Sequence, residues 1–420
     1  LVDCTAIDFD GNDDNITFRN NYDLTGNFSI EVWVKSDGSS SNLRTILSKR
    51  DANNLVNGYD LRLVNNIISF HWNNGQSIVS PFPLNNNRWH HVAVTYGSGN
   101  YRLYIDGIQM GIGAGSAPIA NTLDFLVGAM DQDLPMPYDP VNFFAGMLDE
   151  LRIWGVQLSE DQIRAMMNQE IEDNGGNVRG SVVPLDINPL VWTDLIGYYQ
   201  MNQATDIVAG NLMDISVSGI NGRLRKMTTN QAETTPLPYQ SVNNGLFTAS
   251  ATWLDGNVQN LPFTTGIDGT TRVEWNIVRI SNDVVARNID PVLYGLDITS
   301  NSLIVRQTNV LDGHSLRVTK YLKLNGLLDL YGESQLLMDN GSIVDPASTG
   351  ELQRDQQGTT NLYNYNYWTS PVNEGSNTYT IDGVLKDGTT YTNPQNIAWT
   401  SSHDATGAVN PISISNRWLY

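Results

Sequence analysis

Residues 28–36 read FSIEVWVKS, a run in which aliphatic side chains occupy alternate positions. The alternation separates two faces of an extended chain: Ile30, Val32 and Val34 on one, and Glu31, Trp33 and Lys35 on the other. A period of two residues predicts a β-strand. The same alternation recurs in five further segments that are separated by clusters of Asn, Gly, Ser or Pro: TILSKRD (45–51), GYDLRLV (58–64), IISFHW (67–72), RWHHVAVTY (88–96) and YRLYIDGIQM (101–110).

Short strands that follow one another without intervening helices predict an antiparallel sandwich or jelly roll. The dipeptide Asp106-Gly107 is a two-residue hairpin signal. A further strand is expected in FAGMLDELRIW (144–154), and one helix is expected in SEDQIRAMMNQEI (159–171). Ser159 is the expected N-cap of that helix, because Gln162 three residues later completes a capping box.

The order of these motifs resembles the laminin-G-like, concanavalin A-like jelly-roll family, which is also similar to the pentraxins. The motifs that carry the resemblance are AIDFDGNDDNITF (6–18), FSIEVWVK, GYDLRL, RWHHVAVTY, YRLYIDG, LVGAMDQD (126–133) and FAGMLDELRIWGVQLSEDQI (144–163). The resemblance implies a jelly roll over residues 1–240. Residues 171–192 depart from the family pattern as a long connection before the closing strand.

The second half of the chain has a repeat of 19 to 20 residues. Apolar residues recur at this spacing in three series, Leu296, Leu316 and Leu336, then Ile298, Val318 and Met338, and then Val305, Leu324 and Ile343. Such a period predicts a parallel β-solenoid, in which each rung buries its side chains on the next. A meander with similar spacing is the alternative. The predicted order is therefore the jelly roll, a connecting segment 241–270, a solenoid 271–371 with a Tyr-rich cap, and a partial β-unit 372–420 that includes a hairpin at 378–391.

The composition narrows the class of partner. The formal net charge of −20 repels phosphate backbones, so we expect no nucleic-acid partner. No apolar run reaches the roughly 20 residues of a membrane helix, so we expect no membrane insertion. Cys4 is the only cysteine, which excludes an intrachain disulfide. The low lysine content and abundant Asn, Thr, Ser and Gly favour a secreted β-protein, and we expect adjoining modules in a longer chain.

The carboxylate pattern bears on catalysis, because the resembled fold also hosts polysaccharide hydrolases. Retaining glycosidases place two carboxylates about 5 Å apart on one face. Asp149 and Glu150 are adjacent, so a regular strand points them to opposite faces. The five histidines lack metal-binding spacing. We therefore expect no enzyme activity.

Calcium is the expected cofactor, because it prefers carboxylate, amide and carbonyl oxygens in loops. In the opening stretch DFDGNDDNITF, Asp10 is the first choice of ligand, and the resembled fold implies Asp149 as its partner on a neighbouring strand. A polar turn held by Asx hydrogen bonds is the alternative. Asp131, Gln132 and Asp133 match the acidic calcium loop of pentraxins, with a solvated loop as the alternative.

The resemblance implies a ligand at loop rims near the ion, either a glycan or a surface protein. Trp72 and Tyr138 are the candidate ligand-binding residues, although a strand Trp more often packs in a core. The phrase YNYWTSPV (365–372) after the solenoid resembles segments of large Bacteroidota surface proteins that are exported by the type IX route. We therefore expect an extracellular, non-enzymatic adhesin segment similar to those of attachment and gliding. A carbohydrate-binding accessory region of a polysaccharide-degrading enzyme and a structural stalk spacer are the alternatives.

Overall fold

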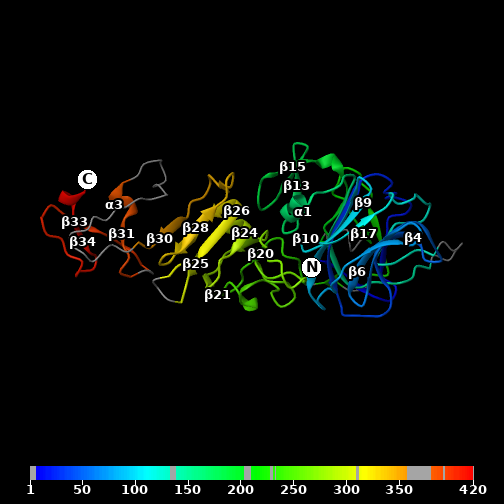
Figure 1. Cartoon of the computed structure of the whole chain (residues 1–420), viewed down its shortest axis with the longest axis horizontal. Helices are drawn as coiled ribbons and strands as arrows, with labels where there is room; N and C mark the ends of the chain where they lie inside the picture. The colour runs from blue at the N-terminus through cyan, green and yellow to red at the C-terminus, as the bar shows by residue number, and fades with distance from the viewer. Residues whose placement is uncertain are drawn as a thin grey trace.

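A computed structural model describes residues 6–132, 139–202, 210–227, 230–231, 233–308, 312–356, 380–390 and 393–419. The structure is built mainly from strands, in line with the predicted all-β class. Figure 1 shows a sandwich at one end of the long axis, a stack of short strands in the middle and the C-terminal strands at the other end. The order of modules along the chain is therefore also their order in space.

The N-terminal module is an antiparallel sandwich of two eight-stranded sheets, as predicted. The first sheet runs in the order β10 (Ile108–Ala114), β9 (Asn100–Ile105), β8 (Trp89–Gly97), β3 (Phe28–Ser36), β12 (Ala145–Trp154), β1 (Ala6–Asp10) and β19 (Asn230–Gln231), with β16 (Leu195–Tyr199) also paired to β12. The second sheet runs β17 (Asn211–Leu212), β18 (Gly222–Arg225), β2 (Asn15–Thr17), β11 (Leu126–Val127), β4 (Arg44–Asp51), β5 (Asn54–Val64), β6 (Ile67–Trp72) and β7 (Gln76–Val79). Asp106 and Gly107 both have positive φ and join β9 to β10, which confirms the predicted hairpin turn.

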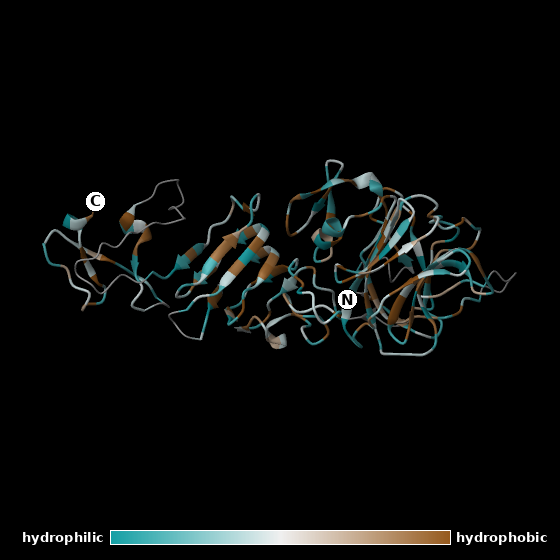
Figure 2. Ribbon diagram, viewed as in Figure 1, coloured by the Kyte–Doolittle hydropathy of each residue, from teal (hydrophilic) through white to brown (hydrophobic). Residues whose placement is uncertain are grey.

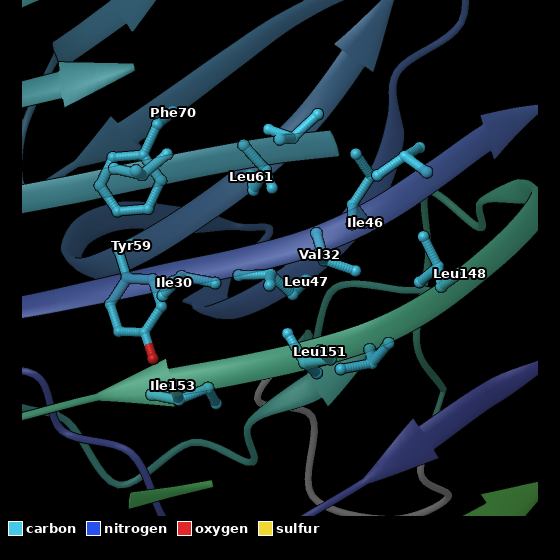
Figure 3. Close-up of a cluster of buried hydrophobic side chains, with 14 of the residues drawn as sticks. Ile30, Val32, Ile46, Leu47, Tyr59, Leu61, Phe70, Leu148, Leu151 and Ile153 are labelled. Carbon is cyan, nitrogen blue, oxygen red and sulfur yellow. The ribbon is translucent and has the colours of Figure 1, made fainter. Parts of the chain in front are cut away.

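The core of the sandwich is formed by the inward face of each strand. Figure 3 shows Ile30 and Val32 of β3 among side chains from β4, β5 and β12. These residues are at most 1 % exposed, as the alternation in FSIEVWVKS requires. Burial of this apolar surface is the main stabilising contribution to the module.

The outward face of β3 is covered as well, which the sequence pattern did not predict. Glu31, Trp33 and Lys35 are each no more than 4 % exposed. The cover includes helix α1 (Glu160–Met166), which begins at the predicted capping box of Ser159 and Gln162. A small antiparallel sheet of β13 (Ile171–Asn174), β14 (Asn177–Gly180) and β15 (Asp186–Val191) follows α1, and then the 3-10 turn η1 (Trp192–Asp194). The long connection at 171–192 thus contributes to a third layer.

The central module is a parallel β-solenoid, which excludes the meander. One face stacks β20 (Tyr239–Gln240), β22 (Ile277–Ile280), β24 (Val292–Ile298), β26 (Ser315–Leu324) and β28 (Gln335–Met338), with β29 (Ile343–Val344) also paired to β26. The other face stacks β21 (Gly245–Leu246), β23 (Val284–Arg287), β25 (Ser302–Arg306), β27 (Leu327–Leu330) and β30 (Glu351–Arg354). The pairings within both faces are parallel. Figure 2 shows apolar positions recurring in successive strands. The parallel ladder begins at Tyr239, ahead of the predicted start at residue 271.

The register of the solenoid differs from the predicted repeat. Leu316 pairs with Leu336 as expected, but Leu296 pairs with Leu322 rather than with Leu316. The ladder between β24 and β26 shifts register, and the connection 307–314 before β26 is longer than the connection 288–291 before β24. Ile298 likewise pairs with Leu324 rather than with Val318, and Val305 pairs with Leu330 rather than with Leu324. Several rungs are longer than predicted, so a constant period of 19 to 20 residues does not hold across the solenoid.

The C-terminal residues form two small pairs of strands. β31 (Lys386–Asp387) pairs with β32 (Gln395–Asn396), and β33 (Ala398–Thr400) pairs in parallel with β34 (Ser413–Ser415). The predicted hairpin at 378–391 is wrong, because Ile381–Val384 form a helical turn, α3, capped by the Thr380 hydroxyl. The Tyr-rich cap falls within 357–379, outside the described residues. The 3-10 turns η2 (Ser250–Thr252) and η3 (Asn416–Trp418) complete the elements.

The sandwich and the start of the solenoid are joined by specific contacts. The indole of Trp275 lies under the guanidinium of Arg164, 3.7 Å from ring centroid to Cζ, and donates to the Asp106 carbonyl at 3.1 Å. The backbone N–H of Trp89 donates to the Val258 carbonyl at 2.9 Å. These contacts connect α1, β8 and the β9–β10 turn to residues 258–275, so the two modules share an interface as well as a covalent link.

We expect Leu316→Asn to destabilise the solenoid strongly, because Leu316 is fully buried and an unpaired amide would face the stacked core. The expected loss is about 3–5 kcal/mol of unfolding free energy. Leu337→Asn is the matched control, since Leu337 is 44 % exposed on the neighbouring strand. The protection of backbone amides of residues 277–338 against hydrogen exchange measures the stability of the solenoid in both variants. Equal protection in the two variants would contradict the assigned packing.

Candidate functional site

The turn between β1 and β2 gathers three carboxylates. Asp10, Asp13 and Asp14 each offer an oxygen within 4.8 Å of the others. The turn is shaped by Asx-type hydrogen bonds, because Asp10 Oδ1 accepts from the Asn12 N–H at 2.8 Å and Asp14 Oδ2 accepts from the Asp10 N–H at 3.0 Å. We call Asp10, Asp13 and Asp14 the acidic triad.

Asp14 is the unusual member of the acidic triad. Its side chain is fully buried, and its Oδ1 has no hydrogen-bond partner within the part of the chain described. Burial, with the nearby charges of Asp10 and Asp13, raises its pKa to about 6. The Asn12 N–H, by contrast, lowers the pKa of the exposed Asp10 carboxyl. A buried carboxylate oxygen without a donor, beside two further carboxylates, is chemically suited to a hard cation.

The prediction that Asp149 is the partner of Asp10 is wrong. β1 does lie beside β12, but the register pairs Asp10 with Ala145, four residues away from Asp149 along β12. Asp149 is 2 % exposed, and its two oxygens accept from the Glu150 N–H and the Thr235 hydroxyl, both at 2.9 Å. The neighbouring strand was correctly expected, and only its register separates the two carboxylates.

The predicted pentraxin-like loop lies at a rim of the sandwich, next to the β4–β5 turn. Asp131 forms a parallel bridge with Asp51, and its carbonyl accepts from the Ala52 N–H at 2.8 Å. The Asn53 amide donates to the Gln132 carbonyl at 3.2 Å. The Asp131 carboxylate accepts from the N–H groups of Gln132 and Asp124, so it also shapes the turn. Asp133 and Tyr138 fall within 133–138, outside the described residues.

Sequence reasoning missed the contribution of the β4–β5 turn to this rim. Asp51 ends the predicted strand TILSKRD (45–51) and Asn53 follows it in the sequence SKRDANN, which was the available signal. Leu55 and Val56 follow and are 38 % and 45 % exposed, although they are large and apolar. We call residues 51–56 with Asp131 and Gln132 the rim patch.

Trp72 is not a surface residue, and the prediction that it stacks on a sugar is wrong. It is 1 % exposed and lies parallel to the ring of Tyr101, with 3.8 Å between centroids. Its strand alternation points the indole between the two sheets, where it packs with Phe70. The alternative that a strand Trp belongs to the core therefore holds.

Asp149 and Glu150 do not point to opposite faces as a regular strand requires. The ladder of β12 with β3 shifts register between Asp149 and Arg152, and Glu150 has a φ of 52°. Leu148 and Leu151 therefore both enter the sandwich core, and the two acids between them lie outside that core cluster. Both acids are 2 % exposed.

The two buried acids have different partners. Glu150 Oε2 accepts from the Tyr198 hydroxyl at 2.8 Å and forms an ion pair with Arg152. Burial raises the pKa of Glu150 to about 7, with the Arg152 charge opposing the shift. Burial and the neighbouring Glu150 hold the pKa of Asp149 well above its ordinary range. Burial therefore opposes ionisation of both acids, and the ion pair with Arg152 partly offsets this effect at Glu150.

Comparison with known proteins agrees with the fold. Residues 10–164 match the model of the Concanavalin A-like lectin/glucanases superfamily. The rat sushi, von Willebrand factor type A, EGF and pentraxin domain-containing protein 1 is 27 % identical over 129 residues, which is 29 % of this chain and 3 % of that protein. Human neuronal pentraxin-1 is 31 % identical over 103 residues, 23 % of this chain and 24 % of that protein.

Among solved structures, this chain is similar to a Bacteroides ovatus protein provisionally assigned to carbohydrate binding, with 20 % identity and a TM-score of 0.40. That match covers 56 % of this chain and 62 % of the other. The lectin-type fold of residues 10–164 supports a binding module. Within the described residues, no helix combines the length and apolar character needed to cross a membrane.

We expect the free energy of unfolding to fall as the pH rises from about 4.5 to about 7, because folded Glu150 holds a proton that the unfolded chain releases. The contribution of this group is at most about 3 kcal/mol. Glu150→Gln should flatten the slope, because it replaces the titrating carboxyl with a neutral amide. Urea unfolding across this pH range measures both effects, with exposed Glu172→Gln as control. An unchanged slope in Glu150→Gln would contradict the assignment.

Proposed function

We propose that this chain is a non-enzymatic, calcium-supported binding segment whose jelly roll recognises a glycan or a surface protein at the rim patch. The observation that carries the proposal is the rim patch itself. It joins two turns about 80 residues apart in the chain, and it presents amide and carboxylate groups beside exposed Leu55 and Val56. Polar groups that fix orientation next to exposed apolar side chains are typical of binding surfaces.

The contacts of the two buried acids favour binding over hydrolysis. Glu150 is engaged by Arg152 and Tyr198, and both oxygens of Asp149 accept hydrogen bonds. A glycosidase needs one carboxylate free as a nucleophile or base and a second free as an acid. Neither acid of this pair has that freedom in the folded chain.

We place calcium at the acidic triad, because Oδ1 of buried Asp14 has no hydrogen-bond partner within the described residues. A cation there would compensate the buried charge and hold the β1–β2 turn, and Gly11 of that turn already lies against Ala145 at the start of β12. The rim patch, with Asp51, Asp131 and Gln132, is the second proposed position. In both places the available ligands are oxygens, as calcium prefers.

The proposed location is the cell surface. The successive modules extend along one axis (Figure 1), which suits a protein that holds a binding rim away from its anchor. We propose the adhesin role, and the link to type IX-exported surface proteins of Bacteroidota, on the resemblance of residues 365–372.

A stalk spacer is the second candidate function. The specific contacts of Trp275 with Arg164 and Asp106 join the sandwich to the solenoid, and such an interface gives a semi-rigid rod whether or not the rim binds a ligand. A carbohydrate-binding accessory region of a polysaccharide-degrading enzyme is the remaining alternative. It would bind its glycan at the same rim patch, and it differs from an adhesin only in having a catalytic domain as its neighbour.

Removal of calcium with a chelator should lower the melting temperature of the sandwich, because calcium that binds only the folded state stabilises that state. The stabilisation is about 2.7 kcal/mol when the free calcium concentration is one hundred times the dissociation constant. Asp14→Asn should abolish this response. In the presence of chelator the same variant should be at least as stable as the parent chain, since it removes a buried unpaired charge. Thermal unfolding with and without calcium measures this, and Asp404→Asn is the exposed control. A full calcium response in Asp14→Asn would exclude the acidic triad.

A glycan array separates the proposed ligands. We expect Val56→Lys to weaken binding by about tenfold or more, because it places a charge on the apolar part of the rim patch. Val79→Lys is the matched control, since Val79 is 50 % exposed on β7, outside the rim patch. Equal losses in both variants would argue against the rim patch. An array without signal, with or without calcium, would exclude glycans and favour a protein ligand or the spacer.

A further inference from the structure

A cavity of about 180 Å³ lies where the sandwich meets the segment that leads into the solenoid. Asp149 of β12 and Glu170, just before β13, line it on the side of the sandwich. Thr235 and Leu237, which lie between β19 and β20, and Gln240 of β20 line it on the other side. This volume is on the order of ten times what one water molecule needs, so a small organic molecule fits there.

The cavity is lined by two carboxyl groups, those of Asp149 and Glu170, which have no cationic partner among the lining residues. No lysine, arginine or histidine is among its lining residues in the described chain. The nearby cations have other partners, since Arg152 pairs with Glu150 and Glu31, and Lys35 pairs with Glu233 at 2.9 Å. Burial, Glu150 and Glu170 all raise the pKa of Asp149, as expected where no cation stabilises the carboxylate.

The remaining walls offer neutral hydrogen-bonding groups and an apolar surface. Thr234, Thr235 and Gln240 supply hydroxyl and amide groups that match ligand hydroxyls. Leu237 and Leu254, with Pro238, supply apolar contacts of the kind that pack on the C–H face of a ring. Leu254 is 37 % exposed, so it borders solvent. The lining therefore matches a molecule with a positive charge, several hydroxyl groups and an apolar face.

A bare metal ion fits this cavity less well. The three-carboxylate grouping found among the described residues is the acidic triad, and neither Asp149 nor Glu170 belongs to it. Both oxygens of Asp149 already accept hydrogen bonds at 2.9 Å. The volume also exceeds what an ion with direct protein ligands requires.

We propose that the cavity lined by Asp149, Glu170 and Thr235 binds a small polyhydroxylated amine of the amino-sugar class. The protonated amine lies against the Glu170 carboxylate, and the hydroxyl groups bind the threonine and glutamine side chains. This site is separate from the rim patch and does not depend on the function proposed for it.

The test is calorimetric titration of the full chain at neutral pH with D-glucosamine, D-glucose and calcium chloride as probes. We expect D-glucosamine to bind at least about tenfold more tightly than D-glucose, because a hydrogen bond to a charged group contributes more than a neutral one. Glu170→Gln should remove this preference. Leu254→Trp, which narrows the entrance without changing a charge, should weaken D-glucosamine binding by about tenfold or more. Glu172→Gln, an exposed carboxyl on β13 that pairs with Arg179, should leave binding unchanged.

Any of the following results would overturn the proposal: no D-glucosamine binding by the parent chain, equal affinity for the two sugars, unchanged binding in both Glu170→Gln and Leu254→Trp, or equal losses in Glu172→Gln and Glu170→Gln. Calcium binding that is lost in Glu170→Gln and kept in Asp14→Asn would also overturn it, in favour of a metal site. Val56→Lys should keep full D-glucosamine affinity, so failure at this cavity and failure at the rim patch are separable.

Discussion

The buried guanidinium of Arg152 organises the covered face of the jelly roll. It forms ion pairs with Glu31 of β3 and Glu150 of β12, and it donates to the Met166 carbonyl at 3.2 Å and the Gln169 carbonyl at 2.8 Å. One side chain therefore links two neighbouring strands to the end of α1 and to the residues that follow it. A charge buried at this depth is stable only with such partners, so the helix and the connection after it must pack here.

The third layer decides where ligands can reach the molecule. Because α1 and the small sheet cover the outward face of the first sheet, that face is closed to a large partner. Accessible polar groups are left at the rim patch, where the β4–β5 turn meets Asp131. Asp149 and Glu170 face the residues that lead into the solenoid, and together they line the acidic cavity. The rim patch and the cavity are thus two separate places on the molecule.

Local pattern predicted local structure well. The alternation around Ile30, the Asp106-Gly107 turn and the Ser159 cap depend on neighbours within a few residues, and the structure confirms all three. Long-range register was not predictable in the same way. The partner of Asp10 on β12 depends on pairing across about 135 residues, and a displacement of a few positions turned Asp149 from an expected ligand into a buried acid. The pairing of Leu296 with Leu322 was not predicted from a constant period for the same reason.

By itself the sequence determined the class of each module, because hydrophobic alternation, turn residues and the apolar repeat act through nearest neighbours and the energy of burial. It also determined that acidic and amide groups gather at turns. Only the tertiary structure decided which of these groups meet. Register, the bulge at Glu150 and the covering layer set those distances, and each arises from packing between segments far apart in the chain. Trp72 illustrates the difference. An indole can stack on a sugar ring, but Trp72 is buried between the two sheets, where no sugar can reach it.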